Sequence, residues 1–166
     1  DYENYLLNDI NQDLINLYQT MQVKPQVFIN EAARLFVPRN NEADAYYEMR
    51  KQFNACKTKF ERSLLFLYLN RHGYNGLCRY NKSGGFNVPF GKYKKPYFPV
   101  AELEFFAEKA QKAVFTCVGY RETFEQVKSG DVVYCDPPYV PLSKTASFTS
   151  YASNGFGLDE QADLAN

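Results

Sequence analysis

The stretch VVYCDPPY, residues 132–139, determines the expected fold. An apolar run leads into Asp136, and this predicts a strand over 131–135 that ends at an acid. Pro137 and Pro138 have no N–H group, so a strand ladder cannot continue through them. In open α/β sheets, ligands bind at the carboxyl ends of the strands. The stretch therefore predicts a binding site at the edge of a sheet.

The order Asp-Pro-Pro-Tyr suits the binding of an amino group on a planar heterocycle. Such a group has two N–H donors; the Asp136 carboxylate can accept one and the Pro137 carbonyl the other. These bonds draw the nitrogen lone pair out of the ring and make it nucleophilic. Tyr139 can stack on the ring, which contributes about 1–3 kcal/mol. The alternative is an ordinary turn, because Asp-Pro and Pro-Pro dipeptides are common in turns.

A second acid follows a strand near the start of the chain. The apolar run at 4–10 predicts a buried strand, and LINLYQTMQ predicts a helix that Asn11 or Asp13 could cap. An acid at the end of the strand in a βα unit commonly binds ribose hydroxyls. Asp9 fits this role, with Ile10 available to pack on an adenine ring; the alternative is that Asp9 caps the helix.

Strands and helices alternate along most of the chain, which favours a parallel α/β sheet. The segment 24–70 is expected to be helical, with an interruption at Pro38, and to form an insertion together with the segment after it. The other expected elements are a helix at about 100–113, a strand at 114–118, a helix or turn at 121–130 and a helix at 159–166.

Residues 71–97 differ in composition from the rest of the chain. They include five glycines and two prolines, which disfavour a regular helix, and SGG between Tyr80 and Phe86 predicts a hairpin turn. The segment also has six basic residues, six aromatic residues and no acid. Basic side chains contact phosphates, and aromatic side chains stack on bases or wedge between them. This favours a nucleic-acid surface; the alternative is a solvated loop.

Two residues of this segment are candidates for base-specific contacts. Arg79 follows small and apolar neighbours, which suits a side chain that reaches base edges, where arginine prefers guanine O6 and N7. Leu77 can contact the methyl group of thymine.

Composition sets broad limits on the class of protein. The chain has 166 residues, 45% of them hydrophobic and 23% charged, which predicts a packed globular chain. The four cysteines form no CxxC pair and there is one His, so neither a zinc site nor a disulfide framework is indicated. We expect reduced thiols, no membrane span, no secretory signal and a cytoplasmic location. The net charge of zero averages +6 over 71–97 and −6 over the remainder, so it does not argue against DNA.

The chain resembles the bacterial DNA adenine-N6 methyltransferases of the Dam type. The resemblance rests on YLLNDINQDLINLY, FLYLNRHGYNGLCRYN, FNVPFGKYKKPYFP and VVYCDPPYVPL and extends along essentially all residues. It implies methyl transfer from S-adenosylmethionine to adenine N6 in GATC sites of double-stranded DNA, on a flipped-out base. It also implies a partial Rossmann-like methyltransferase sheet (1–23 and 99–166) with an inserted helical target-recognition domain (24–98) that contains a β-hairpin.

The resemblance assigns roles residue by residue. Asp136, Pro137, Pro138 and Tyr139 match the catalytic motif, and Asp9, Tyr120 and Asp136 the cofactor site. The residues that match the DNA-binding positions are Tyr74, Asn75, Leu77, Arg79, Pro89, Lys92, Tyr93 and Lys94, with Arg79 as the guanine reader and the last three at phosphates.

One departure from the family is large. Its members begin with a Gly-rich segment that holds the methionine part of the cofactor, and no such motif occurs in this chain. We therefore expect a fragment with an intact recognition region, an incomplete cofactor site, little activity alone and exposed strand edges that favour dimerisation or swapping. The alternatives are a non-catalytic nucleic-acid-binding module, or methylation of RNA adenine or of cytosine N4, which the recognition-loop match disfavours.

Overall fold

The computed structural model describes residues 2–138 and 156–165. The chain forms two compact units, Asp1–Cys117 and Val118–Asn166. The first contains a small parallel sheet and most of the helices, and the second contains two short helices joined by loops.

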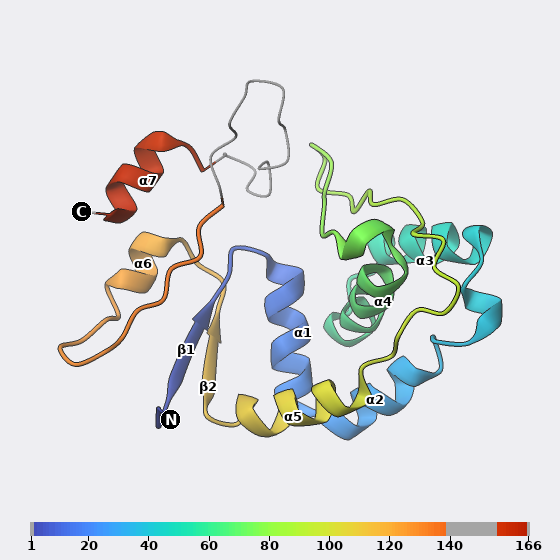
Figure 1. The fold of residues 1–166 in the computed structure, drawn as a ribbon, viewed down its shortest axis with the longest axis horizontal. Coiled ribbons are helices and arrows are strands. Elements are labelled where there is room, and N and C mark those ends of the chain that lie inside the picture. The colour runs from blue at the N-terminus through green and yellow to red at the C-terminus, as the bar shows by residue number, and fades with distance from the viewer. Residues whose placement is uncertain (1, 139–155, 166) are drawn as a thin grey trace. The chain divides into compact units, whose positions relative to one another are not determined.

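Two parallel strands form the sheet of the first unit. β1 (Tyr5–Asn8) pairs with β2 (Ala113–Thr116), with Tyr5 opposite Ala113 and Asn8 opposite Thr116. Figure 1 shows α1 (Gln12–Val23) beside these strands and α5 (Val100–Ala110) leading into β2. The two strands near 4–10 and 114–118, a parallel sheet and the mixed α/β class are as expected from the sequence. The prediction that the first strand is buried is wrong, because Leu6 and Leu7 of β1 are 39% and 42% exposed.

Helices cover one face of this sheet. The buried residues Ile15, Ala110 and Phe115 form a small core between α1, α5 and β2. On the opposite face, Leu6 and Val114 are partners in the sheet and are 39% and 60% exposed. Both faces of a parallel sheet are usually covered.

The structure shows which of the two predicted residues, Asn11 or Asp13, caps the N-terminus of α1. Asn11 is the N-cap, because its Oδ1 accepts hydrogen bonds from Asp13 N at 3.0 Å and Leu14 N at 3.4 Å. Asp13 does not cap the helix and is 7% exposed. Asp9 is not the cap either.

The larger core takes Leu17 and Met21 from α1, Ala107 from α5 and most of its other residues from the helices that follow α1. These are α2 (Pro25–Ala33), the 3-10 helix η1 (Pro38–Asn40), α3 (Ala43–Ala55) and α4 (Lys59–His72). The helical segment at 24–70, with an interruption at Pro38, is therefore confirmed. Aromatic side chains fill much of the core: Phe28, Tyr46, Phe53 and Tyr68 have no exposed surface.

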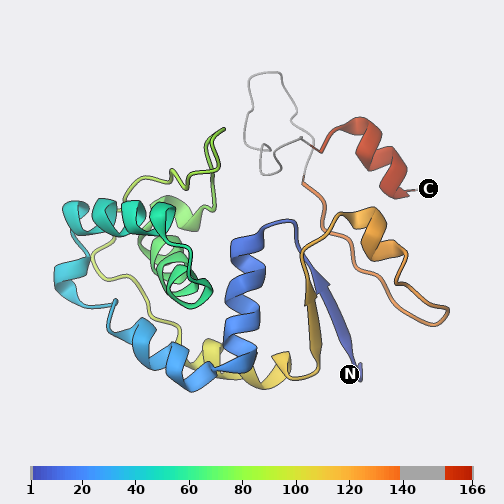
Figure 2. The same cartoon turned by 180° about the vertical axis from the view of Figure 1, so that it is seen from behind.

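Residues 80–86 form the predicted hairpin turn. Tyr80 and Phe86 make an isolated antiparallel bridge, and Asn81 N donates to Gly85 O at 2.8 Å. The turn needs a glycine at Gly84, whose φ is +77°. Its tip projects away from the helices of this unit in Figures 1 and 2.

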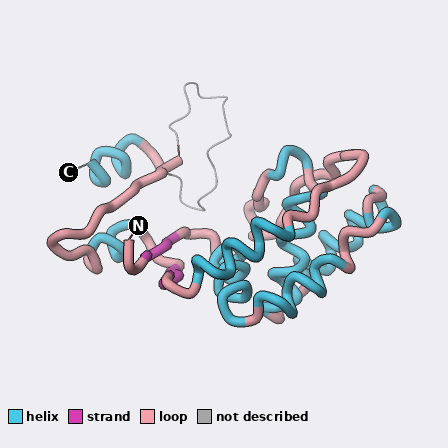
Figure 3. Tube along the Cα trace, turned by 60° about the horizontal axis from the view of Figure 1, so that its bottom comes forward, coloured by secondary structure: helices cyan, strands magenta, loops and turns pink. Residues whose placement is uncertain are grey.

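The second unit differs from expectation at one element. The two expected helices are present as α6 (Tyr120–Phe124) and α7 (Leu158–Ala165). The prediction of a strand over 131–135 is wrong, because no strand is assigned there. Figure 3 shows this stretch as loop. Val132 and Tyr134 are 70% and 88% exposed, and the described residues supply no neighbouring strand to bond with their backbone. An apolar segment forms a strand only where its N–H and C=O groups find partners.

In the described part of the chain, no helix has both the length and the apolar character required to cross a lipid bilayer.

Candidate functional site

Most of the residues expected to contact DNA lie on the surface of the first unit. Leu77 is half-buried and packs against the helical core. The other seven are exposed: Tyr74, Asn75, Arg79, Pro89, Lys92, Tyr93 and Lys94.

Hydrogen bonds join the separate stretches that carry these residues. Tyr74 N donates to Pro89 O at 2.9 Å, and Asn75 N donates to the hydroxyl of Tyr93 at 2.9 Å. Asn41 Nδ2, from just before α3, donates to Tyr93 O at 2.7 Å. The structure therefore places residues 74–75, 89 and 93 on one connected framework, which we call the recognition surface (residues 74–94).

Helix α3 holds the backbone of the second half of the hairpin. Asn54 makes two hydrogen bonds to Phe86, one to its N–H at 2.8 Å and one to its carbonyl at 3.1 Å. Tyr46 and Arg50 both donate to the carbonyl of Val88, at 3.0 and 2.9 Å. These three helical residues are four positions apart, so they form one stripe along α3. Sequence reasoning missed this stripe, whose signal was the repeat of polar side chains at that spacing.

The segment that α3 holds, residues 86–89, alternates between buried and accessible side chains. Phe86 and Val88 are 2% and 0% exposed, whereas Asn87 is half-buried and Pro89 is exposed. Asn87 bonds through its side chain to the guanidinium of Arg79. Asn87 is a further site residue that the sequence reasoning missed, although this apolar–polar alternation could have placed it beside Pro89 on the outer face.

The positive charge of residues 71–97 is not neutralised within the first unit. None of its six basic side chains forms an ion pair in the described parts of the chain. An exposed cationic surface of this kind attracts polyanions.

The backbone at Lys92 is also unusual. Its φ is +57°, a conformation that non-glycine residues rarely adopt and that costs about 1 kcal/mol.

A partly buried ion pair links the hairpin to α1 and α4. The Arg62 guanidinium forms two hydrogen bonds with the Asp13 carboxylate, one of them from Nη2 to Oδ2 at 2.9 Å. The Tyr80 hydroxyl donates to the same Oδ2 at 2.7 Å. Burial, and then the bond to Asp13, raises the pKa of Tyr80, so its hydroxyl remains a donor at neutral pH. The bond to Asp13 also raises the pKa of Arg62.

Asp9 lies at the carboxyl end of β1, where the sequence placed it. Its Oδ1 accepts a hydrogen bond from Asn11 N at 2.6 Å, which fixes the carboxylate at the turn into α1. Its Oδ2 accepts no hydrogen bond from the described residues. The neighbouring Ile10 is 61% exposed. This pair presents a carboxylate oxygen next to an apolar side chain.

The Asp-Pro-Pro segment lies in the second unit. Asp136 is exposed, Pro137 and Pro138 are half-buried, and the Pro138 carbonyl accepts a hydrogen bond from Gln161 Nε2 at 3.0 Å. Tyr139 falls outside the described residues.

Tyr120 begins α6 in the same unit. Its hydroxyl donates to Asp163 Oδ2 at 2.5 Å, and this bond raises the pKa of Tyr120. Its ring meets Phe156 edge to face, with centroids 5.8 Å apart. The hydroxyl therefore has a protein partner, and the ring is the part of Tyr120 suited to packing on a ligand.

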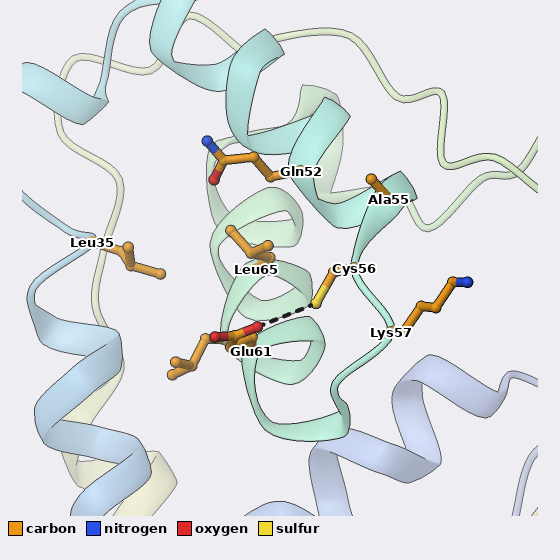
Figure 4. Close-up of a pocket in the computed structure, with 8 residues that line it drawn as sticks. Leu35, Gln52, Ala55, Cys56, Lys57, Glu61 and Leu65 are labelled. Atoms are coloured by element: carbon orange, nitrogen blue, oxygen red, sulfur yellow. Dashed lines mark hydrogen bonds between the residues drawn. The ribbon is translucent and has the colours of Figure 1, made fainter.

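A hollow lies against α3 and α4 in the first unit. It has a volume of about 540 Å³ and is lined partly by Leu35, Leu64 and Leu65 (Figure 4). Cys56 and Glu61 lie next to each other in its lining, with the thiol sulfur 3.7 Å from Glu61 Oε2. No residue that the sequence assigned to a site lines it.

An acid at the end of a parallel strand, an exposed basic hairpin and an Asp-Pro-Pro segment are together typical of enzymes that modify nucleic-acid bases. The chain belongs to the D12 class of N6 adenine-specific DNA methyltransferases, whose family model matches residues 1–166.

Individual relatives are similar along the whole chain. A DNA adenine methylase of Vibrio cholerae (serotype O1, El Tor Inaba N16961) is 64% identical over 166 residues, which make up 100% of this chain and 60% of the relative. The DNA adenine methylase of Escherichia coli K12 is 55% identical over 165 residues, 99% of this chain and 59% of the relative. That of Salmonella typhi is 54% identical with the same coverage. The chain thus spans about 60% of the length of these curated relatives.

Proposed function

We propose that this protein transfers a methyl group from S-adenosylmethionine to the N6 atom of adenine in GATC sites of double-stranded DNA. The observation that carries the proposal is the recognition surface: its residues are exposed, joined by hydrogen bonds and rich in positive charge. The family to which the chain belongs supports the same chemistry.

The amino group of a flipped-out adenine is the proposed ligand of the Asp-Pro-Pro-Tyr segment. The Asp136 carboxylate accepts one N–H and the Pro137 carbonyl accepts the other, while Tyr139 stacks on the base. The rigid φ of the prolines keeps that carbonyl in place. Localising the lone pair on N6 in this way makes the nitrogen nucleophilic without a strong general base.

The residues at the end of β1 fit the adenosine part of S-adenosylmethionine. Asp9 presents Oδ2 for the ribose hydroxyls and Ile10 presents an exposed apolar side chain for the adenine ring. Tyr120 is proposed to pack on the cofactor through its ring.

When bound, S-adenosylmethionine supplies a sulfonium methyl group; the C–N bond forms as the C–S bond breaks, and N6 then loses a proton. Because the chain has no Gly-rich segment for the methionine part, we propose that residues 1–166 alone have little or no activity.

The recognition surface divides between base contacts and phosphate contacts. Arg79 reads guanine, and Leu77 and Pro89 make apolar contacts in the major groove. Tyr74 and Asn75 are proposed to contact the DNA from the same surface. Lys92, Tyr93 and Lys94 contact phosphates.

The proposed domain organisation follows from the same division. Residues 1–23 and 99–166 belong to a Rossmann-like catalytic domain, and residues 24–98 form a target-recognition domain inserted into it. One observation supports this: β1 and β2 are neighbours although a long helical stretch separates them in the chain. The helical core itself is shared, because Leu17 and Met21 of α1 and Ala107 of α5 pack in it with residues of α2, α3 and α4.

Strand edges are the proposed site of self-association. β1 and β2 have no further strand beside them among the described residues, and the apolar segment 131–135 is exposed. Unpaired edges of this kind pair readily with another chain. Size-exclusion chromatography coupled to light scattering, run over a range of concentrations, tests whether the chain dimerises.

The proposed activity is best tested in a chimera in which residues 1–166 replace the matched 166 residues of the Vibrio cholerae relative. We expect the chimera to methylate duplexes that contain GATC and to spare duplexes without it. Asp136→Ala should abolish methylation and leave the affinity for duplex DNA within about twofold. Glu125→Ala is the matched control, because it removes another exposed acid of the second unit.

The outcomes separate the alternatives. If the chimera binds DNA but methylates nothing, a non-catalytic nucleic-acid-binding module is the better description. If the methyl group appears on cytosine N4 or in RNA, the substrate assignment fails. If Asp136→Ala retains activity, the segment is an ordinary turn.

A further inference from the structure

Among the described residues, one neighbour, Asn87, forms the hydrogen bonds to the guanidinium of Arg79. Its Nε donates to Asn87 Oδ1 at 2.8 Å, and its Nη2 donates to the backbone carbonyl of Asn87 at 3.2 Å. Asn87 N in turn donates to the carbonyl of Arg79 at 3.0 Å, so the two residues are paired across the hairpin. The side chain and the backbone of one residue therefore hold the arginine.

These bonds occupy one defined edge of the guanidinium. Arginine has five N–H donors in a planar fork, and it can bind a base through the Nε–Nη2 edge or through the Nη1–Nη2 edge. Asn87 takes the Nε–Nη2 edge of Arg79. The second N–H of Nη2 and the adjacent N–H of Nη1 form the other edge, and this edge matches the O6 and N7 acceptors of guanine.

Asn87 is itself held by bonds that do not depend on its side chain. Its neighbour Phe86 is bonded through both backbone groups to Asn54 of α3. Its other neighbour, Val88, is bonded through its carbonyl to Tyr46 and Arg50. Helix α3 thus fixes the backbone on both sides of Asn87, and this sets where its Oδ1 meets Arg79.

We propose that Asn87 is a positioning residue that presents the Nη1–Nη2 edge of Arg79 to a guanine of the target site. The proposal rests on the proposed function, in which Arg79 reads a base. An exposed arginine normally samples many rotamers, and a side chain already held in its binding geometry loses less conformational entropy when the base arrives. Asn87 therefore acts on specificity through Arg79 and not through a base contact of its own.

The test measures methylation by the chimera on a GATC duplex and on duplexes in which one base pair of the site is replaced at a time. The discrimination at each position is the ratio of kcat/KM for the two duplexes. Arg79→Ala identifies the base pair that Arg79 reads. Asn87→Ala should lower discrimination by about 5- to 150-fold at that base pair and leave the other positions within about twofold.

Two further variants separate positioning from a structural effect. In the double variant Arg79→Ala/Asn87→Ala, discrimination should equal that of Arg79→Ala alone, because Asn87 has no arginine left to orient. Asn87→Asp retains an oxygen acceptor for Nε and should restore discrimination toward the unsubstituted value. Lys94→Ala is the control for a general loss of DNA affinity, since it should lower kcat/KM alike on all duplexes.

The possible failures point to different causes. The positioning role is overturned if Asn87→Ala lowers kcat/KM equally on every duplex, acts at another base pair, or adds to the effect of Arg79→Ala. If Arg79→Ala leaves discrimination unchanged in an active, GATC-specific chimera, the assignment of Arg79 as a reader is wrong, and the inference falls with it. If the unsubstituted chimera has no preference for GATC, the proposed function itself fails.

Discussion

The Tyr80 hydroxyl donates a 2.7 Å hydrogen bond to Asp13 Oδ2, and so joins the base of the hairpin to the first turn of α1. Asp13 also pairs with Arg62 of α4, whose guanidinium lies 4.0 Å from the centre of the Phe53 ring. One carboxylate thus ties together the sheet-side helix, the helical core and the recognition surface.

Removal of that carboxylate should destabilise the fold. In Asp13→Ala, the partly buried Arg62 loses its counter-ion and Tyr80 loses its acceptor, so we expect the free energy of unfolding to fall by about 1–3 kcal/mol. Urea denaturation followed by circular dichroism measures this. Glu48→Ala is the matched control, because its 3.9 Å pair with Lys51 is exposed and is worth about 0–1 kcal/mol. Equal losses in the two variants would contradict a special role for the Asp13–Arg62 pair.

The stability of the first unit should depend on pH through His72. This side chain is 1% exposed, and burial lowers its pKa to about 4, while Nδ1 lies 3.0 Å from the carbonyl of Tyr68. The unfolded chain binds the proton near pH 6.5, so stability is full above that value and falls as the pH drops toward 4. Between pH 6.5 and 5 the loss should be about 1–2 kcal/mol.

Denaturation curves at half-unit steps from pH 7.5 to 5.0 check this dependence. His72 is the single histidine of the chain, so His72→Gln should be less stable at pH 7.5 but nearly flat over the same interval. A slope that persists in His72→Gln would assign the effect to other groups.

Arg79 and Lys94 should differ in what they contribute to DNA binding. Arg79→Ala should cost about 1–3 kcal/mol of discrimination at one base pair. Lys94→Ala should weaken binding to all sequences alike and reduce the slope of log Kd against log salt by about one. Fluorescence anisotropy with cognate and substituted duplexes at several salt concentrations measures both. The same pattern from the two variants would refute this division.

Asn54→Ala tests whether the hydrogen bonds from α3 stabilise the hairpin. It leaves the N–H and the carbonyl of Phe86 without their partner, and we expect a loss of about 1–3 kcal/mol in the free energy of unfolding. Hydrogen exchange should speed up at the amide of Phe86 in particular. Gln52→Ala on the exposed side of α3 is the control and should change stability by less than about 0.5 kcal/mol. An unchanged exchange rate at Phe86 would exclude Asn54 as its anchor.

The parts of the fold that depend on local signals could be predicted from the sequence. The strand at β1, the helix after it and the hairpin turn each have a periodicity, a cap or a glycine that acts within a few residues. The strand at 131–135 could not be judged in this way, because an apolar segment also needs a partner strand, and the described residues offer none.

In the candidate site, too, residues with a local sequence signal were predicted and residues that depend on distant contacts were missed. Exposed basic and aromatic residues such as Arg79 and Lys94 were apparent from composition, and the structure places them on the surface. Asn87 and Asn54 were missed because their roles depend on contacts across 8 and 32 residues of sequence. A polar residue gives no local signal of which distant backbone or guanidinium it binds.

The way α3 holds the hairpin has a consequence for how specificity can change. Tyr46, Arg50 and Asn54 bond only to main-chain atoms of the segment that follows the turn. Main-chain atoms are the same whichever amino acid occupies the position. Exchanges at Asn87 and Pro89 therefore leave the scaffold intact, and this makes the outer face of the segment a natural starting point for evolving or engineering enzymes directed at other target sequences.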